Sequence, residues 1–261
     1  MELKHIGTDK KSGRYDFELS DVSAGVANAL RRAMSESVPT MAIEKVEFAN
    51  NSSALYDEIV AHRLGLIPLK TDLKSYTLPA KCTCEGAGCA KCELKLTLKS
   101  NTAGWVTAES LKSKDPAVVP VYPNMPIAKL VKGQEIELEA TAVLGRGSEH
   151  AKWSPGLIWF ENKSSITVNP KSPKLAEFKD KYPPQAFDSS GVISKKQIET
   201  NNLAEACAGI CDDIVKVDYD DSVFVFHIES WGQLAAQEII TVAAELIQSD
   251  LNIFMDAFKA A

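Results

Sequence analysis

The 261-residue sequence contains no run of about 18 apolar residues, the length that a membrane-spanning helix requires. Its most apolar stretch, residues 234–258, is interrupted by glutamine, glutamate, aspartate and asparagine. No apolar segment follows the N-terminal MELKHIGTDKKSGRYDFEL, so we expect no secretory signal. We therefore expect a cytoplasmic protein without a membrane span, in which clustered cysteines serve as metal ligands more often than as disulfides.

A surplus of positive charge is also missing. The chain has 29 lysines and arginines against 35 aspartates and glutamates, a net charge of −6. A free-standing DNA-binding protein usually has the opposite balance, because lysine and arginine supply its phosphate contacts. Non-specific nucleic-acid binding is therefore disfavoured as the main function.

Recognisable catalytic motifs are absent as well. The four histidines (His5, His62, His150 and His227) form no H-E-x-x-H motif, and none lies near a glycine-flanked serine or cysteine. Neither G-x-x-x-x-G-K-[ST] nor G-x-G-x-x-G occurs. The sequence therefore predicts a protein with no catalytic site of its own.

The sequence does have a cluster of cysteines in KCTCEGAGCAKC, residues 81–92, with the spacing C-x-C-x4-C-x2-C. The four residues are Cys82, Cys84, Cys89 and Cys92. Four thiolates make a closed tetrahedral zinc site with no open position for catalysis, whereas iron–sulfur spacings are usually wider. We predict structural Zn²⁺, with a metal-free reduced loop or, less favoured, a disulfide as the alternatives. The loop has no aromatic residue, so a structural role, in which the metal cross-links the loop, is favoured over nucleic-acid binding.

Hydrophobic periodicity predicts an α+β fold with helices and strands at both chain ends. The expected elements there are strands within 15–20, 41–50 and 222–230 and helices within 21–38, 54–65 and 231–258. Between them, residues 70–168 contain short β-rich runs separated by glycine and proline, at 94–100, 117–123, 127–131, 136–145, 157–161 and 165–169. Residues 169–221 have many charges and few large apolar residues, which indicates a small α+β appendage.

The C-terminal helix has an apolar stripe at helical spacing. Its members are Ile239, Val242, Ala243, Leu246, Ile247 and Phe254. The apolar side also takes in Ile240, Leu251, Ile253 and Phe258, so it is wider than one contact needs. Such a helix either lies deep in a core or packs against another chain.

Three segments match known motifs: ANALRRAMSESVPTMAIEKVEF at 27–48, HRLGLIPL at 62–69 and GSEHAKWSP at 147–155. The first resembles the assembly helix of the RNA polymerase alpha-like family. The other two resemble motifs of its archaeal and eukaryotic members, and the sequence is most similar to the archaeal ones. Related members are the third-largest subunit of eukaryotic RNA polymerase II and the bacterial alpha N-terminal region.

The resemblance implies a discontinuous dimerisation domain at 1–48 and 222–261, an inserted β-rich domain at 49–168 and a ferredoxin-like insertion at 169–221. In this family the terminal helix packs against the equivalent helix of a small partner, subunit L in archaea. The heterodimer is the platform for the two large catalytic subunits. The implied function is a non-catalytic assembly subunit of DNA-dependent RNA polymerase, which meets DNA only through the assembled complex.

The resemblance also implies roles for particular residues. At least one of Arg31 and Arg32 points outward, since consecutive helical residues lie about 100° apart, and a guanidinium suits a partner's carboxylates. The cysteine loop resembles the zinc loop of eukaryotic relatives. Many archaeal relatives bind iron–sulfur clusters in the insertion, but this chain has only Cys207 and Cys211 there. A cluster needs four cysteine ligands, so we expect no complete cluster.

Two other functions remain open at this point. One is a stand-alone zinc-dependent nucleic-acid-binding protein, which the acidic balance disfavours. The other is an iron–sulfur redox protein, which the shortage of cysteines outside the loop disfavours. Cys207 and Cys211 fit small buried hydrophobic residues better than metal ligands.

Overall fold

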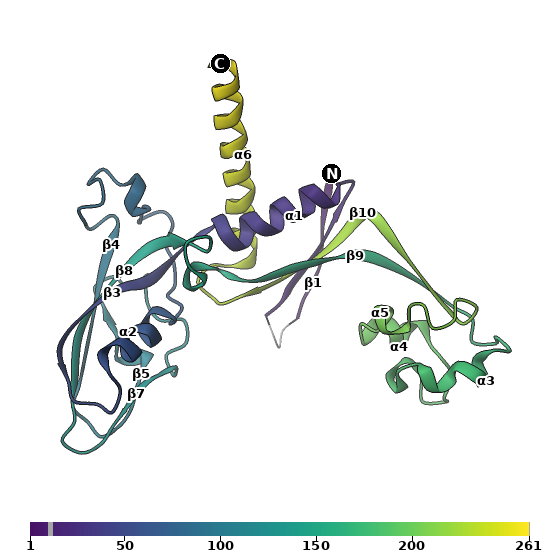
Figure 1. The fold of residues 1–261 in the computed structure, drawn as a ribbon, viewed down its shortest axis with the longest axis horizontal. Coiled ribbons are helices and arrows are strands. Elements are labelled where there is room, and N and C mark those ends of the chain that lie inside the picture. Colours follow the sequence, from purple (N-terminus) through teal and green to yellow (C-terminus); the bar gives the residue numbers. More distant parts are fainter. Residues whose placement is uncertain (10–12, 261) are drawn as a thin grey trace. The chain divides into compact units, whose positions relative to one another are not determined.

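The computed structural model describes residues 1–9 and 13–260 (Figure 1). The chain divides into two units, each of which combines segments from different parts of the sequence. The smaller unit comprises Met1–Ile6, Phe17–Ala27 and Phe160–Phe226. The larger unit comprises Gly7–Asp16, Asn28–Trp159 and His227–Ala261.

The strands form three sheets, with the orders β1-β2-β10-β9, β3-β8-β4-β6 and β5-β7. Their bounds are β1 Glu2–Thr8, β2 Tyr15–Ser20, β3 Pro39–Asn51, β4 Glu93–Ser100, β5 Gly104–Thr107, β6 Lys112–Ser113, β7 Pro126–Leu130, β8 Ile136–Arg146, β9 Gly156–Val168 and β10 Val215–Ser230. The helices are α1 Ala24–Arg32, α2 Asp57–Gly65, α3 Leu175–Phe178, α4 Lys195–Thr200, α5 Ala204–Cys207 and α6 Ala236–Ala260.

The core of the larger unit is built on β3, β8 and β4, which pair antiparallel. Strand β4 alternates buried leucines with exposed polar residues, as a strand with one buried face should. Leu96 lies opposite Ala140 and Leu98 opposite Leu138, so apolar pairs line the buried face.

Helix α2 packs on this core through Val60 and Leu64, which are fully buried. Its first turn contains Asp57 and its last turn contains Arg63, an order that suits the helix dipole. Ile59 is exposed, because the buried face follows Val60 and Leu64 at a spacing of four residues.

The run 117–123 was predicted as a strand, but it forms only one isolated bridge, between Leu69 and Pro120. Its two prolines, Pro120 and Pro123, lack the amide hydrogen that a ladder position needs. The segment is therefore a loop, and it contributes the buried side chain of Val118 to the core.

The runs 157–161 and 165–169 were predicted as two strands of the inserted β-rich domain. They belong to the single strand β9, apart from Asn169, which follows it. This strand lies in the sheet of β1, β2 and β10, which come from the two chain ends. Periodicity shows that a strand forms but does not show which strand it pairs with.

The predicted α+β appendage, 169–221, contains the short helices α3, α4 and α5 and, from Val215, the start of strand β10. The segment 169–214 is described throughout, and its only β pairing is one isolated bridge, Phe187 with Ile193. It has an apolar core of its own, which includes Tyr182, Ile198 and Cys207. Despite its many charges, the segment therefore contributes a core to the smaller unit.

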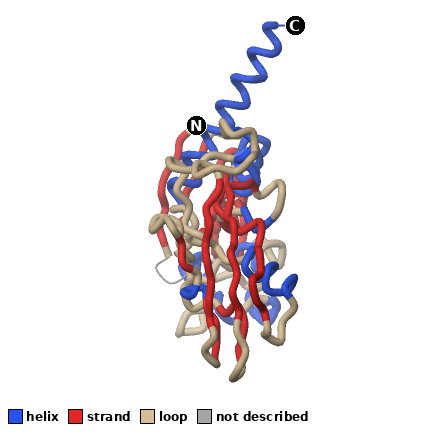
Figure 2. Tube along the Cα trace, turned by 90° about the vertical axis from the view of Figure 1, so that its left-hand side faces the viewer, coloured by secondary structure: helices blue, strands red, loops and turns tan. Residues whose placement is uncertain are grey.

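Helix α6 ends the described chain and extends beyond the rest of the larger unit (Figures 1 and 2). It begins at Ala236, five residues later than predicted, because Gly232 has a φ of +88° and the chain turns there. Its residues 251–260 are all exposed. Among the described helices, none combines the length and the apolar character needed to cross a membrane.

Candidate functional site

The assembly-helix motif folds as α1 followed by a tight π-helical turn, Ala33–Ser37, which we call the π-turn. Helix α1 is capped by Ser23, whose hydroxyl oxygen accepts a hydrogen bond from the Val26 amide at 3.4 Å. The π-turn closes where the Val38 amide donates to the Ala33 carbonyl at 3.1 Å. Pro39 then begins β3, so Val38 alone separates the π-turn from the strand.

The π-turn is held by the backbone that follows β8. The Ser148 amide donates to the Glu36 carbonyl at 3.0 Å. A Cβ at Gly147 would lie 2.2 Å from the Ser35 carbonyl oxygen, so only glycine allows this approach. The first and third sequence motifs are therefore in direct contact in the structure.

Arg31 and Arg32 lie on the last turn of α1 and differ in their hydrogen-bond partners. The Nε of Arg31 donates to Asn28 Oδ1 at 3.0 Å. Nη2 of Arg32 lies 3.0 Å from Glu36 Oε2, and the Arg32 side chain is 61% exposed. That hydrogen bond lowers the pKa of Glu36. The outward guanidinium is therefore Arg32, already paired within the chain.

The apolar stripe of α6 divides into a buried and an exposed part. Ile239 and Ala243 are fully buried where α6 packs on the π-turn, so they have no surface left for a partner. Val242, Leu246 and Ile247 are half-buried. Of the predicted interface residues on this helix, these three and Phe254 can still contact another chain.

The end of α6 exposes a continuous set of large apolar side chains. Phe254 and Phe258 are 68% and 77% exposed, and their rings stack at 6.5 Å between centroids. Leu251, Ile253 and Met255 are more than half exposed as well. The sequence analysis did not include Met255, because it lies beside the stripe and not on it. Exposed apolar side chains gathered in this way mark a surface for a partner.

The four thiols of the cysteine loop lie close enough together to bind one metal ion. Their Sγ atoms all lie within 4.8 Å of one another. Cys82 Sγ and Cys89 Sγ are 3.5 Å apart, and Cys84 Sγ and Cys92 Sγ are also 3.5 Å apart. Bonds of about 2.3 Å in a tetrahedron put sulfurs about 3.8 Å apart. The donor set therefore fits a four-thiolate zinc site.

The loop backbone is shaped to bring these sulfurs together. Glu85, Gly86 and Gly88 have positive φ angles of 52°, 84° and 88°. A Cβ at Gly88 would lie 2.6 Å from an oxygen at the flexible end of the Glu93 side chain, so the strain of another residue there comes from the positive φ. The Cys89 amide donates to Cys92 Sγ at 3.3 Å, a contact that stabilises a metal-bound thiolate.

The thiols differ in acidity before any metal binds. Hydrogen bonds from Cys82 and Cys92 lower the pKa of Cys84 to about 6. Burial raises the pKa of Cys92 to about 12. Cys84 is therefore the more readily ionised thiol, and a bound cation would have to displace the proton from Cys92.

Cys207 and Cys211 do not form a comparable group. Cys207 is fully buried in the apolar core of the smaller unit, and burial raises its pKa. Helix α5 ends at Cys207, so Cys211 lies beyond the helix. This placement fits the interpretation of Cys207 as a small buried hydrophobic residue.

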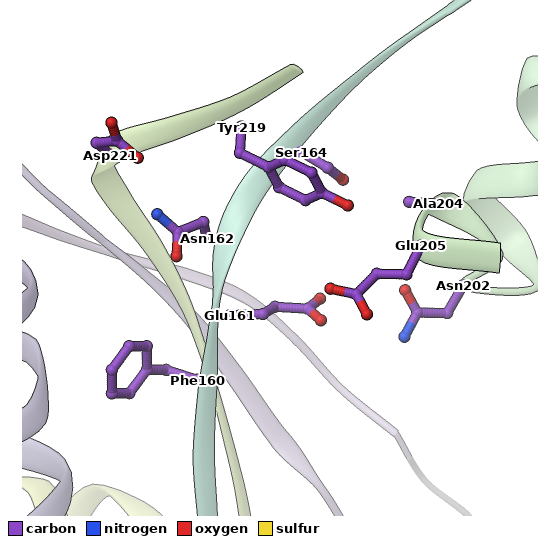
Figure 3. Close-up of a pocket in the computed structure, with 9 residues that line it drawn as sticks. All are labelled: Phe160, Glu161, Asn162, Ser164, Asn202, Ala204, Glu205, Tyr219 and Asp221. Carbon is purple, nitrogen blue, oxygen red and sulfur yellow. The ribbon is translucent and has the colours of Figure 1, made fainter. Parts of the chain in front are cut away.

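The smaller unit also has a surface pocket of about 440 Å³ (Figure 3). Glu161 and Glu205 point toward each other across it, with Tyr219 above them. Asp221 adds a further carboxylate, and no lysine or arginine is among the described residues that line the pocket. Such a surface repels phosphate, so it gives no support to a nucleic-acid-binding function.

Comparison with known proteins yields one family. Residues 45–159 match the family model described as RNA polymerase Rpb3/RpoA insert domain. The chain is similar to DNA-directed RNA polymerase subunit Rpo3 of Methanosarcina acetivorans, with 39% identity over 95% of this chain and 94% of the relative. It is also similar to subunit Rpo3 of Methanosphaera stadtmanae (36% identity, 92% of each chain) and of Thermococcus kodakarensis (35% identity, 95% of each chain).

Proposed function

The chain belongs to the family of archaeal DNA-directed RNA polymerase subunit Rpo3, and we propose that it is a non-catalytic assembly subunit of such a polymerase. It works in the cytoplasm, pairs with the small subunit L and holds the two large catalytic subunits. It meets DNA only through the assembled complex. The enzymatic activity, nucleotidyl transfer, belongs to the large subunits.

The observation that carries this proposal is the exposed apolar end of α6. An aromatic side chain buries about 150–250 Å² when it is covered, at about 25 cal/mol per Å². With 68% of Phe254 and 77% of Phe258 still exposed, each would contribute about 3 kcal/mol of transfer free energy to a partner interface. Pairing of α6 with a helix of subunit L that lies along it would be stabilised by this free energy.

The part of the proposed platform that is formed by the π-turn and the start of α6 is rigid, which suits an assembly surface. Helix α6 is anchored to the π-turn through Ile239 and Ala243, and the π-turn is anchored to the backbone at Gly147. Arg31 and Arg32 lie at the start of this anchored region. We assign them to contacts with a large subunit. A carboxylate of that subunit would replace the present partner of each guanidinium, which is Asn28 for Arg31 and Glu36 for Arg32.

Zinc has a structural role in this proposal. Cys82, Cys84, Cys89 and Cys92 would hold it, and the ion would supply a cross-link for a loop that has few buried apolar residues. The short helices of the smaller unit need no cluster, because Cys207 packs in an apolar core.

The alternative, a stand-alone zinc-dependent nucleic-acid-binding protein, is less well supported. The net charge is −6, and the pocket on the surface of the smaller unit is acidic. The similarity to polymerase subunits covers most of this chain, which leaves no separate nucleic-acid-binding segment to explain.

The test is to tag the chain in its host, purify it gently and identify the proteins that accompany it in stoichiometric amounts. We expect two very large subunits and one small one. Phe254→Asp should abolish pairing with the small subunit, because a charge would be buried in the apolar interface. Asn252→Asp adds the same charge to the polar side of α6 and should leave pairing unchanged. A wild-type chain that purifies alone would refute the proposed function.

A further inference from the structure

A small pocket lies beside the end of β8 in the larger unit. Its volume is about 290 Å³, and its charged lining residues are Glu44, Lys81, Arg146 and Glu149. The others are apolar, Trp153 among them. Cofactor pockets usually measure about 300–1,000 Å³, so this one suits a single side chain better than a cofactor.

Arg146 has no partner in this pocket. Its Nε is buried and makes no hydrogen bond with any described residue. No described carboxylate forms an ion pair with it either, although other cations of this unit are paired, such as Lys95 with Glu139. Buried donors are nearly always satisfied, and an unsatisfied charged one costs more than a neutral one. The Nε therefore lacks an acceptor among the described residues, and no described carboxylate neutralises the guanidinium.

The backbone holds Arg146 in a fixed place. A Cβ at Gly145 would lie 2.3 Å from the Trp153 ring, and one at Gly147 would lie 2.2 Å from Ser35 O. The Arg146 carbonyl accepts hydrogen bonds from the amides of Glu149 and His150, at 2.9 and 3.3 Å. The backbone at Arg146 is therefore fixed, which limits the entropy that this residue loses when it binds a partner group.

The other charges of the pocket leave a positive site. Glu44 is neutralised by Lys152, whose Nζ also donates to the Ile43 carbonyl at 3.1 Å. Lys81 has no carboxylate partner among the described residues, so it adds to the charge of Arg146. Glu149 is exposed and does not pair with Arg146. With Glu44 paired, Lys81, Arg146 and Glu149 leave a net positive charge, so an entering carboxylate would meet two cations, with an apolar wall at Trp153.

We propose that this pocket is a docking site for an acidic side chain, aspartate or glutamate, from a peptide segment of another polymerase subunit. The inference rests on the proposed function, because it needs a subunit to supply that segment. The carboxylate binds the Arg146 guanidinium in a forked, charge-assisted contact, and Lys81, which lines the same pocket, adds a second positive charge. The apolar lining holds the stem of the acidic side chain.

The test uses the tagged full-length chain, purified with its polymerase subunits and washed at rising salt concentration. Arg146→Gln should release a large subunit at lower salt than wild type, with affinity lowered about tenfold or more. The small subunit should stay bound, because it binds α6. Arg146→Lys keeps the charge but not the forked geometry. It should release the subunit at a salt concentration between those of wild type and Arg146→Gln. Glu149→Gln is the matched control, since it removes a charge of the opposite sign from the same pocket, and it should not weaken binding.

Two results would overturn the inference. One is retention of every subunit by Arg146→Gln to the same salt concentration as wild type. The other is equal weakening by Arg146→Gln and Glu149→Gln, which would indicate a pair inside the chain. If even the wild-type chain brings down no polymerase subunit, the proposed function fails and this site fails with it.

A second measurement does not depend on how the variants fold. Carbodiimide treatment of the wild-type complex joins an amine to a carboxylate in direct contact, and mass spectrometry identifies the joined peptides. We expect Lys81 to be joined to an acidic residue of another subunit. Coupling of Lys81 only to residues of its own chain, such as Glu44 or Glu149, would refute the docking site.

Discussion

Removing the metal from the cysteine loop should loosen that loop and leave the rest of the larger unit intact. The perturbation is Cys89→Ser, or a chelator applied to the wild-type chain. The structure supports a local effect because the four sulfurs belong to one eleven-residue loop. The adjacent core on β3, β8 and β4 is made of apolar pairs that do not involve the loop. Loss of the ion therefore removes one cross-link and no core contact.

The size of the effect follows from the length of the loop. A cross-link that closes about eleven residues removes roughly 3 kcal/mol of chain entropy from the open state. That free energy corresponds to a factor of about a hundred in the equilibrium for local opening. Four backbone hydrogen bonds inside the loop report on this opening. They are Glu85 N to Cys82 O, Ala87 N to Cys84 O, Cys92 N to Cys89 O and Glu93 N to Cys89 O, at 2.9–3.0 Å.

The assay is amide hydrogen exchange read by mass spectrometry, together with zinc measured per mole of chain. We expect one zinc per chain in wild type, and exchange in peptides of 81–93 about a hundredfold faster without it. Peptides of β8 should exchange at the same rate in both states. Cys211→Ser, which changes a cysteine outside the loop, should keep its zinc. Equal protection of 81–93 with and without metal, or a wild-type chain free of zinc when purified without chelator, would refute the reasoning.

Two further predictions concern stability. Gly145→Ala would put a Cβ 2.3 Å from the Trp153 ring and should cost about 2–3 kcal/mol in thermal unfolding, while Gly7→Ala, with open space around it, should be nearly neutral. Burial and a hydrogen bond to Asp115 raise the pKa of Tyr76 to about 12, from about 10 when unfolded. The stabilisation is therefore complete below pH 10 and is lost as pH rises through 12, an effect of about 3 kcal/mol. Urea unfolding at pH 9 and pH 11.5 should show about 2 kcal/mol of this loss in wild type, whereas Tyr76→Phe should lack it; an equal loss in the variant would contradict the assignment.

Much of the site could be read from residues that lie close together in the sequence. The four thiols fall within eleven residues, so the loop alone has to bring them together, and two of the residues that allow it are glycines. The long terminal helix was also predictable, because apolar spacing depends on one helix only. Its start was misplaced, since periodicity continues through 231–235 although Gly232 turns the chain there.

Other features depend on which elements meet, and no local pattern records that. Strand β9 has the same composition whether it pairs within the inserted region or with β10, so its sheet could not be inferred. The segment 169–214 looks too polar for a core, yet residues far apart in it, such as Tyr182 and Cys207, belong to one apolar cluster. The sequence did not identify Arg146 as a binding residue, because only its surroundings in the fold show that its Nε has no hydrogen-bond partner.

The sequence by itself determined the family, the four-cysteine cluster and a terminal helix too apolar for solvent. Each of these depends on residues that lie near one another in the sequence or on motifs that occur in a fixed order. Only the tertiary structure decided how the stripe on α6 is used. Ile239 and Ala243 are buried where α6 packs on the π-turn. Phe254 and Phe258 lie farther along the helix and are exposed. The physical reason is that helical spacing repeats along the whole helix, but burial ends where the neighbouring element ends.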